Sequence, residues 1–119
     1  MKDNNILQQK SYAFAIRVVR AYQYLANEKK EYVLSKQFLS SGTSIGANVE
    51  EAIGGQTDKD FFAKLSIVYK EVRETHYWIR LLKDTDYFEP SQASSLLKDC
   101  DEILKITGTI LKTLKNRNS

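Results

Sequence analysis

Apolar residues recur every three or four positions along most of this chain, and this spacing is the feature that most restricts its fold. The clearest run lies mid-sequence, where the steps alternate between four and three: Phe61, Leu65, Val68, Val72, Thr75, Ile79 and Leu82. Residues at this spacing share one face of an α-helix, whereas a half-buried strand alternates every second residue. The run therefore predicts a helix that packs against others at a crossing angle of about 20°.

Three further segments carry the same spacing, so the sequence predicts an all-α protein. The expected helices cover about residues 5–26, 32–53, 58–83 and 90–116. The short links between them cannot run back along a helix of roughly 35 Å, which favours antiparallel neighbours. We therefore predict one domain over residues 1–119, an antiparallel up-down-up-down four-helix bundle. Two extended hairpins that pair only in an oligomer are the alternative.

Residues in the links mark where the helices begin and end. Gly54-Gly55 is expected to end the second helix in the manner of a left-handed C-terminal cap. Thr57 or Asp58 can cap the start of the third helix by accepting hydrogen bonds from its free amides. Pro90 suits the first turn of the fourth, where its missing N–H costs little.

The composition is that of an ordinary globular protein. Apolar residues make up 42% and charged residues 28%, a balance that supplies a core and argues against disorder. No run of about 18 apolar residues occurs and the N-terminal segment is polar, so we expect a cytoplasmic protein with neither a membrane span nor a secretory signal. Cys100, the one cysteine, is expected to be a buried small side chain rather than a reactive thiol.

The residues that catalysis and metal binding require do not occur in recognisable patterns. A bundle that holds two metal ions uses Glu-x-x-His on two helices, but the one histidine, His76, is preceded at that spacing by Arg73. No P-loop and no nucleophile motif occurs. Four carboxylates on the second and third helices are read as solvated or ion-paired: Glu50, Glu51, Glu71 and Glu74. We expect no enzyme activity, no metal and no cofactor.

The second helix contains residues that are poor helix formers. Gly42 and Gly46 each cost about 1 kcal/mol relative to alanine, yet lie one turn apart and form a flat strip. Close packing of a helix inside the bundle is the favoured interpretation, with a subunit contact or a ligand groove as alternatives. Asn48 lies at the edge of this face, and if buried it should bond to the third helix in a polar network with Glu71, Glu74 or Thr75.

The segment from Lys36 to Ala52, KQFLSSGTSIGANVEEA, resembles the four-helix bundle proteins encoded in intervening sequences of bacterial 23S ribosomal RNA genes. The third helix, with Asp60-Phe61 and the run from Glu74 to Leu82, is similar to the same family. The resemblance covers about residues 8–115. It implies a homo-oligomer, pentameric in form, that is historically grouped with ribosomal proteins. A related bundle, the accessory protein of diversity-generating retroelements, is thought to contact nucleic acid and a reverse transcriptase.

Apolar residues also lie away from the predicted core. Tyr12, Ile16 and Val19 follow one another on the outer face of the first helix. Ile67, Trp78 and Leu81 do so on the third. Since soluble monomers rarely expose large contiguous apolar patches, these residues are predicted to form an interface between copies of the chain. A wider core within one chain is the alternative.

Basic residues are segregated, although the net charge is only +3. Lysines recur at seven-residue intervals in the fourth helix, and further basic residues lie in the first helix and near the C-terminal end. The candidates for binding nucleic acid are Lys10, Arg17, Lys98, Lys105, Lys112, Lys115 and Arg117. Repeated in an oligomer, they would attract the phosphates of RNA or DNA. The alternative function is an adaptor for a protein partner, and an ordinary solvated lysine face remains the simplest explanation of the charges.

Overall fold

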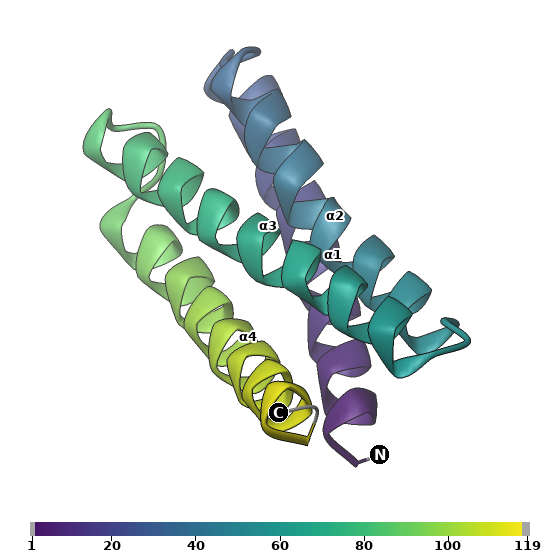
Figure 1. Ribbon diagram of the computed structural model, residues 1–119. Coiled ribbons are helices and arrows are strands. Elements are labelled where there is room, and N and C mark those ends of the chain that lie inside the picture. Colours follow the sequence, from purple (N-terminus) through teal and green to yellow (C-terminus); the bar gives the residue numbers. More distant parts are fainter. Residues whose placement is uncertain (1, 118–119) are drawn as a thin grey trace.

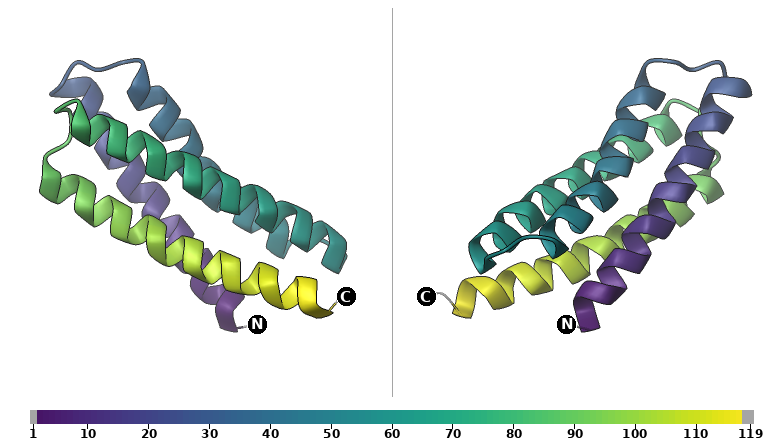
Figure 2. Two further views of the ribbon diagram at one scale, coloured as in Figure 1. Left: turned by 60° about the vertical axis from the view of Figure 1, so that its left-hand side comes forward. Right: turned by 90° about the vertical axis from the view of Figure 1, so that its right-hand side faces the viewer.

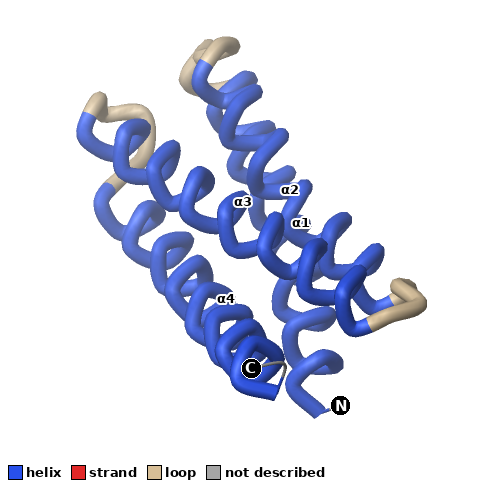
Figure 3. Tube along the Cα trace, viewed as in Figure 1, coloured by secondary structure: helices blue, strands red, loops and turns tan. Residues whose placement is uncertain are grey.

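The computed structural model confirms an all-α fold with four helices. The structure describes residues 2–117, with side chains from residue 4 onward. The helices are α1 (Lys2–Asn27), α2 (Leu34–Ile53), α3 (Asp58–Asp84) and α4 (Pro90–Arg117). Figure 3 shows that short loops join them and that helix accounts for nearly all of the described chain.

The helices form one elongated bundle of 47 × 21 × 21 Å. Each helix packs against its two neighbours around the ring, and in the described residues no Cα atoms of α1 and α3, or of α2 and α4, come within 8 Å of each other. The helices alternate in direction, as the views in Figure 2 show. The up-down-up-down topology is thus closed within a single chain, and the alternative of two extended hairpins is wrong. The α1–α4 seam has the fewest contacts of the four.

The predicted apolar stripes form the core. In α3 every member of the stripe is buried except Phe61, which is half-buried. The stripe of α4 is buried throughout, including Cys100. Burial raises the pKa of the Cys100 thiol to about 12, with smaller contributions from the carboxylates of Asp101 and Asp99, so the thiol stays protonated. The prediction that this cysteine packs as a small apolar residue is confirmed.

Close packing of α1 against α2 accounts for the glycine at position 42. A Cβ atom built on Gly42 would lie 2.7 Å from both methyl groups of Val18, closer than such atoms ever approach. A Cβ on Gly46 would meet the carbonyl oxygen of Ser11 at 3.4 Å, an ordinary contact. The prediction of close packing is therefore confirmed at Gly42, whereas Gly46 makes only a loose approach.

The start of α2 differs from the prediction by two residues because Glu31 caps it. The carboxylate accepts hydrogen bonds from the amides of Val33, Leu34 and Ser35 at 3.2, 3.1 and 2.7 Å. Burial opposes ionisation of this carboxyl, but the three amides and the Ser35 hydroxyl outweigh it and lower the pKa of Glu31. Lys30 makes the turn before it with a φ of 57°.

The far end of α2 corrects another expectation. Gly54 has a φ of −78° in the right-handed region, and none of the described glycines has a positive φ, so the predicted left-handed cap is wrong. The chain instead turns through Gly55, whose amide donates to the carbonyl of Ala52 at 3.1 Å. Thr57, one of the two residues predicted for this role, then caps α3, its hydroxyl accepting from the amide of Asp60 at 3.0 Å.

Candidate nucleic-acid interface

The outer face of α4 carries a row of free lysines. Lys98, Lys105 and Lys112 are all exposed, and so is Lys115 near the end of the helix. Within the described residues none of these four ammonium groups forms an ion pair, although Lys98 lies near enough to Glu102 to contribute to the lowered pKa of that carboxyl. Seven residues make nearly two turns of helix, which is why the first three align along one side.

The other predicted basic residues are engaged in ion pairs. Lys10 donates to Glu102 at 2.9 Å, a hydrogen bond that lowers the pKa of that carboxyl. Arg17 pairs with Asp99 and also donates to the Ser95 hydroxyl at 2.8 Å. These contacts join α1 to α4, so both side chains stabilise the seam and offer less charge to a ligand.

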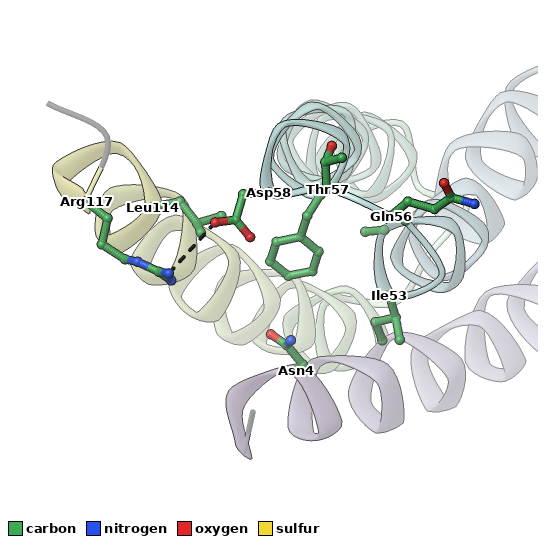
Figure 4. A pocket seen from close by; sticks show the side chains of 10 residues that line it. Asn4, Ile53, Gln56, Thr57, Asp58, Leu114 and Arg117 are labelled. Atoms are coloured by element: carbon green, nitrogen blue, oxygen red, sulfur yellow. Dashed lines mark ion pairs between the residues drawn. The ribbon is translucent and has the colours of Figure 1, made fainter.

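Arg117 lies at the end of the bundle, in a shallow hollow of about 260 Å³ shown in Figure 4. One guanidinium nitrogen is 3.8 Å from a carboxylate oxygen of Asp58 across the hollow. Asn4 from α1 and Ile53 from α2 line other sides. The Oδ1 atom of Asn4 is buried without a hydrogen-bond partner. The pairing with Asp58 makes Arg117 the least available of the basic residues near the end of α4.

A second basic site, which the sequence analysis did not include, lies between α3 and α4. A hollow of about 300 Å³ is lined by Arg73, His76 and Arg80 from α3 and by Asp101 and Leu104 from α4. The Nε of Arg80 donates to Nδ1 of His76 at 3.0 Å, and Nε2 of His76 is 3.6 Å from Asp101. The spacings of three and four between Arg73, His76 and Arg80 indicate that these residues share one face of α3. The sequence alone does not show that this face meets α4, so it could not identify the site.

The predicted apolar face of α1 is exposed. Tyr12 has 66% of its surface accessible, and Ile16 and Val19 are also exposed. A shallow hollow of about 260 Å³ lies beside Tyr12, with Thr43, Gly46 and neighbouring residues of α2 on its other side. The loose approach at Gly46 thus leaves a depression next to an exposed aromatic ring.

The predicted apolar face of α3 is only partly exposed. Ile67 is exposed, whereas Trp78 and Leu81 are half-buried. The indole nitrogen of Trp78 donates to Glu74 at 3.1 Å, and the ring meets Tyr77 edge to face with centroids 5.0 Å apart. This face is therefore less exposed than the sequence suggested.

The polar network predicted around Asn48 has a different form. The Asn48 amide donates to the carbonyl of Ser44 in its own helix at 2.8 Å, and the bond to α3, expected only if Asn48 were buried, is not among its contacts in the described residues. A buried polar link between α2 and α3 is made by Thr75, whose hydroxyl donates to the Glu71 carbonyl in its own helix at 2.8 Å and shares a hydrogen bond with the Ser41 hydroxyl at 2.9 Å. Asn48 is only half-buried, so it does not require a partner across the helices.

Two carboxylates of α3, Glu71 and Glu74, lie close enough to repel each other. Burial raises the pKa of Glu71, and repulsion from Glu74 adds to the effect.

Among the described residues, no group of three or more His, Cys, Asp or Glu side chains lies close enough to hold a metal ion. No helix in the described part of the chain is long and apolar enough to cross a membrane.

These features define a class of protein: a small antiparallel four-helix bundle with a basic surface on its last two helices. The family model described as 23S rRNA-intervening sequence protein matches residues 3–109, and the chain belongs to that family. It is similar to a crystal structure of a protein of unknown function from the S23 ribosomal protein family of Bacteroides thetaiotaomicron, with 47% identity and a TM-score of 0.91. That similarity covers 92% of this chain and 98% of the other. No curated protein matches the sequence.

Proposed function

We propose that this protein is a non-enzymatic, homo-oligomeric bundle that binds RNA through the basic residues of α4. The observation that carries the proposal is the exposed row of Lys98, Lys105 and Lys112, continued by Lys115, without ion pairs among the described residues. Membership of a family described by ribosomal RNA intervening sequences favours RNA over other polyanions. Lysines on a rigid helix attract phosphates without reading the sequence of the bases.

The exposed apolar face of α1 supports the oligomeric part of the proposal. Tyr12, Ile16 and Val19 succeed one another on a surface that a monomer would leave in water. Burial of such side chains between subunits gains roughly 25 cal/mol for each Å² removed from water. Assembly would also repeat the lysine row around the oligomer and strengthen its field.

The test measures RNA binding and subunit number together. Native mass spectrometry with and without a structured RNA gives the stoichiometry, and titrations from low to physiological salt give the electrostatic part of the affinity. Each lost phosphate contact lowers the salt slope by about 0.7–0.9. The variant K105E/K112E/K115E should therefore bind more weakly and with a flatter slope.

A matched control changes three exposed basic residues elsewhere, in R20E/K36E/K59E, and so alters the net charge by the same amount. Binding by the control that exceeds binding by the α4 variant supports the proposal. A wild-type protein that binds no RNA even at low salt would refute it.

The alternative is an adaptor for a protein partner, and the exposure of Tyr12 on α1 is what favours it. In that case the partner would remain bound after nuclease treatment and in high salt, because an apolar contact depends little on ionic strength. Loss of the partner on changing Tyr12 and Ile16 to Ser, with no change on K105E/K112E/K115E, would favour the adaptor over RNA binding.

A further inference from the structure

The α3 side of the hollow between α3 and α4 is a stripe of basic and aromatic residues. Tyr69, Arg73, His76 and Arg80 follow one another at steps of four, three and four, so they lie on one face of α3. Contacts at two of these positions fix that face against α4: the Tyr69 ring lies 3.6 Å from the Cβ position of Gly108, and His76 lies beside Asp101. Arg73 and Arg80 therefore open onto the groove between the helices, where both line the hollow.

The lysine row runs along the exposed surface of α4 beside this hollow. Lys98, Asp101, Lys105, Gly108 and Lys112 follow at steps of three and four and share one stripe of α4. Asp101 and Gly108 from this stripe contact α3, and Lys105 lies between them on the exposed surface of α4, next in sequence to Leu104, which lines the hollow. Arg73 and Arg80 therefore line the hollow itself, and the lysines of α4 lie on the helix surface beside it.

Arg80 is held in position by two contacts. Its Nε is bonded to His76, and its guanidinium carbon lies 5.9 Å from the centre of the Tyr77 ring. The Nε contact leaves the terminal guanidinium nitrogens without a protein partner among the described residues. An arginine fixed in this way loses little entropy on binding a phosphate, which it can hold with two parallel hydrogen bonds.

Tyr77 adds a feature that phosphate binding alone does not use. Tyr77 is 47% exposed beside Arg80, and its ring makes an edge-to-face contact with Trp78. An exposed aromatic ring next to a basic groove provides a surface for stacking of an unpaired base. Bases in a duplex are already stacked on one another and do not offer a free face.

We propose that the groove between α3 and α4 binds single-stranded RNA, with Arg73 and Arg80 on a backbone phosphate and Tyr77 stacked against a base. This inference rests on the proposed RNA binding and names its site and the form of RNA. The lysines of α4 extend the phosphate track along the groove. Asp101 is the one acidic residue that lines the hollow in the described structure, so its carboxylate weakens the site.

The experiment compares labelled oligouridylate of about 12 nucleotides, within the usual site size for single strands, with duplex RNA of equal length by fluorescence anisotropy. R73Q/R80Q should bind the single strand about tenfold more weakly, with a salt slope lower by about 1.4. Y77L should lose about tenfold because stacking is lost, whereas Y77F should bind as the wild type does. D101N should bind more tightly.

The control R20Q/K36Q removes the same two charges from exposed positions on α1 and α2. A wild type that binds no RNA overturns both this inference and the proposed function. If the wild type binds RNA but R73Q/R80Q behaves like R20Q/K36Q, the groove assignment fails and the proposed function stands. If Y77L binds as the wild type does, or if the duplex binds more tightly than the single strand, the assignment to single-stranded RNA is wrong.

Discussion

Replacing Gly42 by alanine tests how closely α1 and α2 pack. The added Cβ would lie 2.7 Å from both methyl groups of Val18, about 1 Å inside the usual carbon–carbon contact distance. Val18 is fully buried and its β-branched side chain has one favoured rotamer in a helix, so it cannot turn away. The two helices must therefore separate.

Two opposing effects set the magnitude. Alanine gains about 1 kcal/mol over glycine in a helix interior, whereas overpacking a tight core costs about 1–3 kcal/mol. Because two methyl groups clash at once, we place the cost in the upper half of that range and expect G42A to lose about 1–2 kcal/mol. Gly46 gives the matched comparison, since its Cβ position has a nearest neighbour at 3.4 Å. G46A should gain up to about 1 kcal/mol.

Urea unfolding followed by circular dichroism measures both variants, at one protein concentration because assembly contributes to apparent stability. In a melt, each kcal/mol corresponds to about 4 °C at this chain length. Adding V18A should cost less in the G42A background than alone, because the clash is then relieved. If G42A is as stable as the wild type, the close approach of α1 and α2 at this point is not real.

Two further predictions concern titratable groups. Because the folded state lowers the pKa of Glu31 from its usual value near 4.5, this carboxylate stabilises the fold above about pH 4.5, and the stabilisation is lost as the pH falls below that value through the lower pKa of the folded state. Between about pH 7 and 3 the wild type should thus lose more stability in urea than E31Q, whose cap does not titrate; parallel losses would contradict this. Cys100, with its pKa raised to about 12, should react with iodoacetamide at about pH 8 only after unfolding, as followed by mass spectrometry. Modification of the folded protein at the rate of the unfolded one would refute its burial.

The sequence was enough to predict the number, direction and apolar stripes of the helices because helical periodicity reports directly which side chains avoid water. It was not enough for the start of α2. The sequence pattern predicted a helix from Tyr32, but the Glu31 carboxylate folds back and accepts hydrogen bonds from the amides of Leu34 and Ser35, so the helix begins two residues later. It was also misleading at Asn48, because an amide near the edge of a stripe can bond to its own helix instead of crossing to the next.

The basic surface was only half predictable. The lysine row on α4 follows from spacing alone, but the ion pairs of Lys10 and Arg17 depend on distances between helices far apart in sequence. In the sequence analysis Arg73 entered only as the residue three positions before the lone histidine, and Arg80 only as part of the run from Glu74 to Leu82. Arg73 and Arg80 form a site because they lie on the face of α3 that is turned toward α4. The apolar stripe determines the rotation of a helix about its axis only approximately, so the sequence did not reveal this orientation.

The sparse seam between α1 and α4 has a consequence for the order of folding. The other three seams join helices that are consecutive in the chain, so their formation closes only short loops. The seam between α1 and α4 must close a loop that contains all of α2 and α3, and it has fewer contacts to offset the conformational entropy lost on closing that loop. This seam should therefore form after the rate-limiting barrier. Disrupting it, as in R17A, should accelerate unfolding in stopped-flow experiments while leaving the folding rate nearly unchanged.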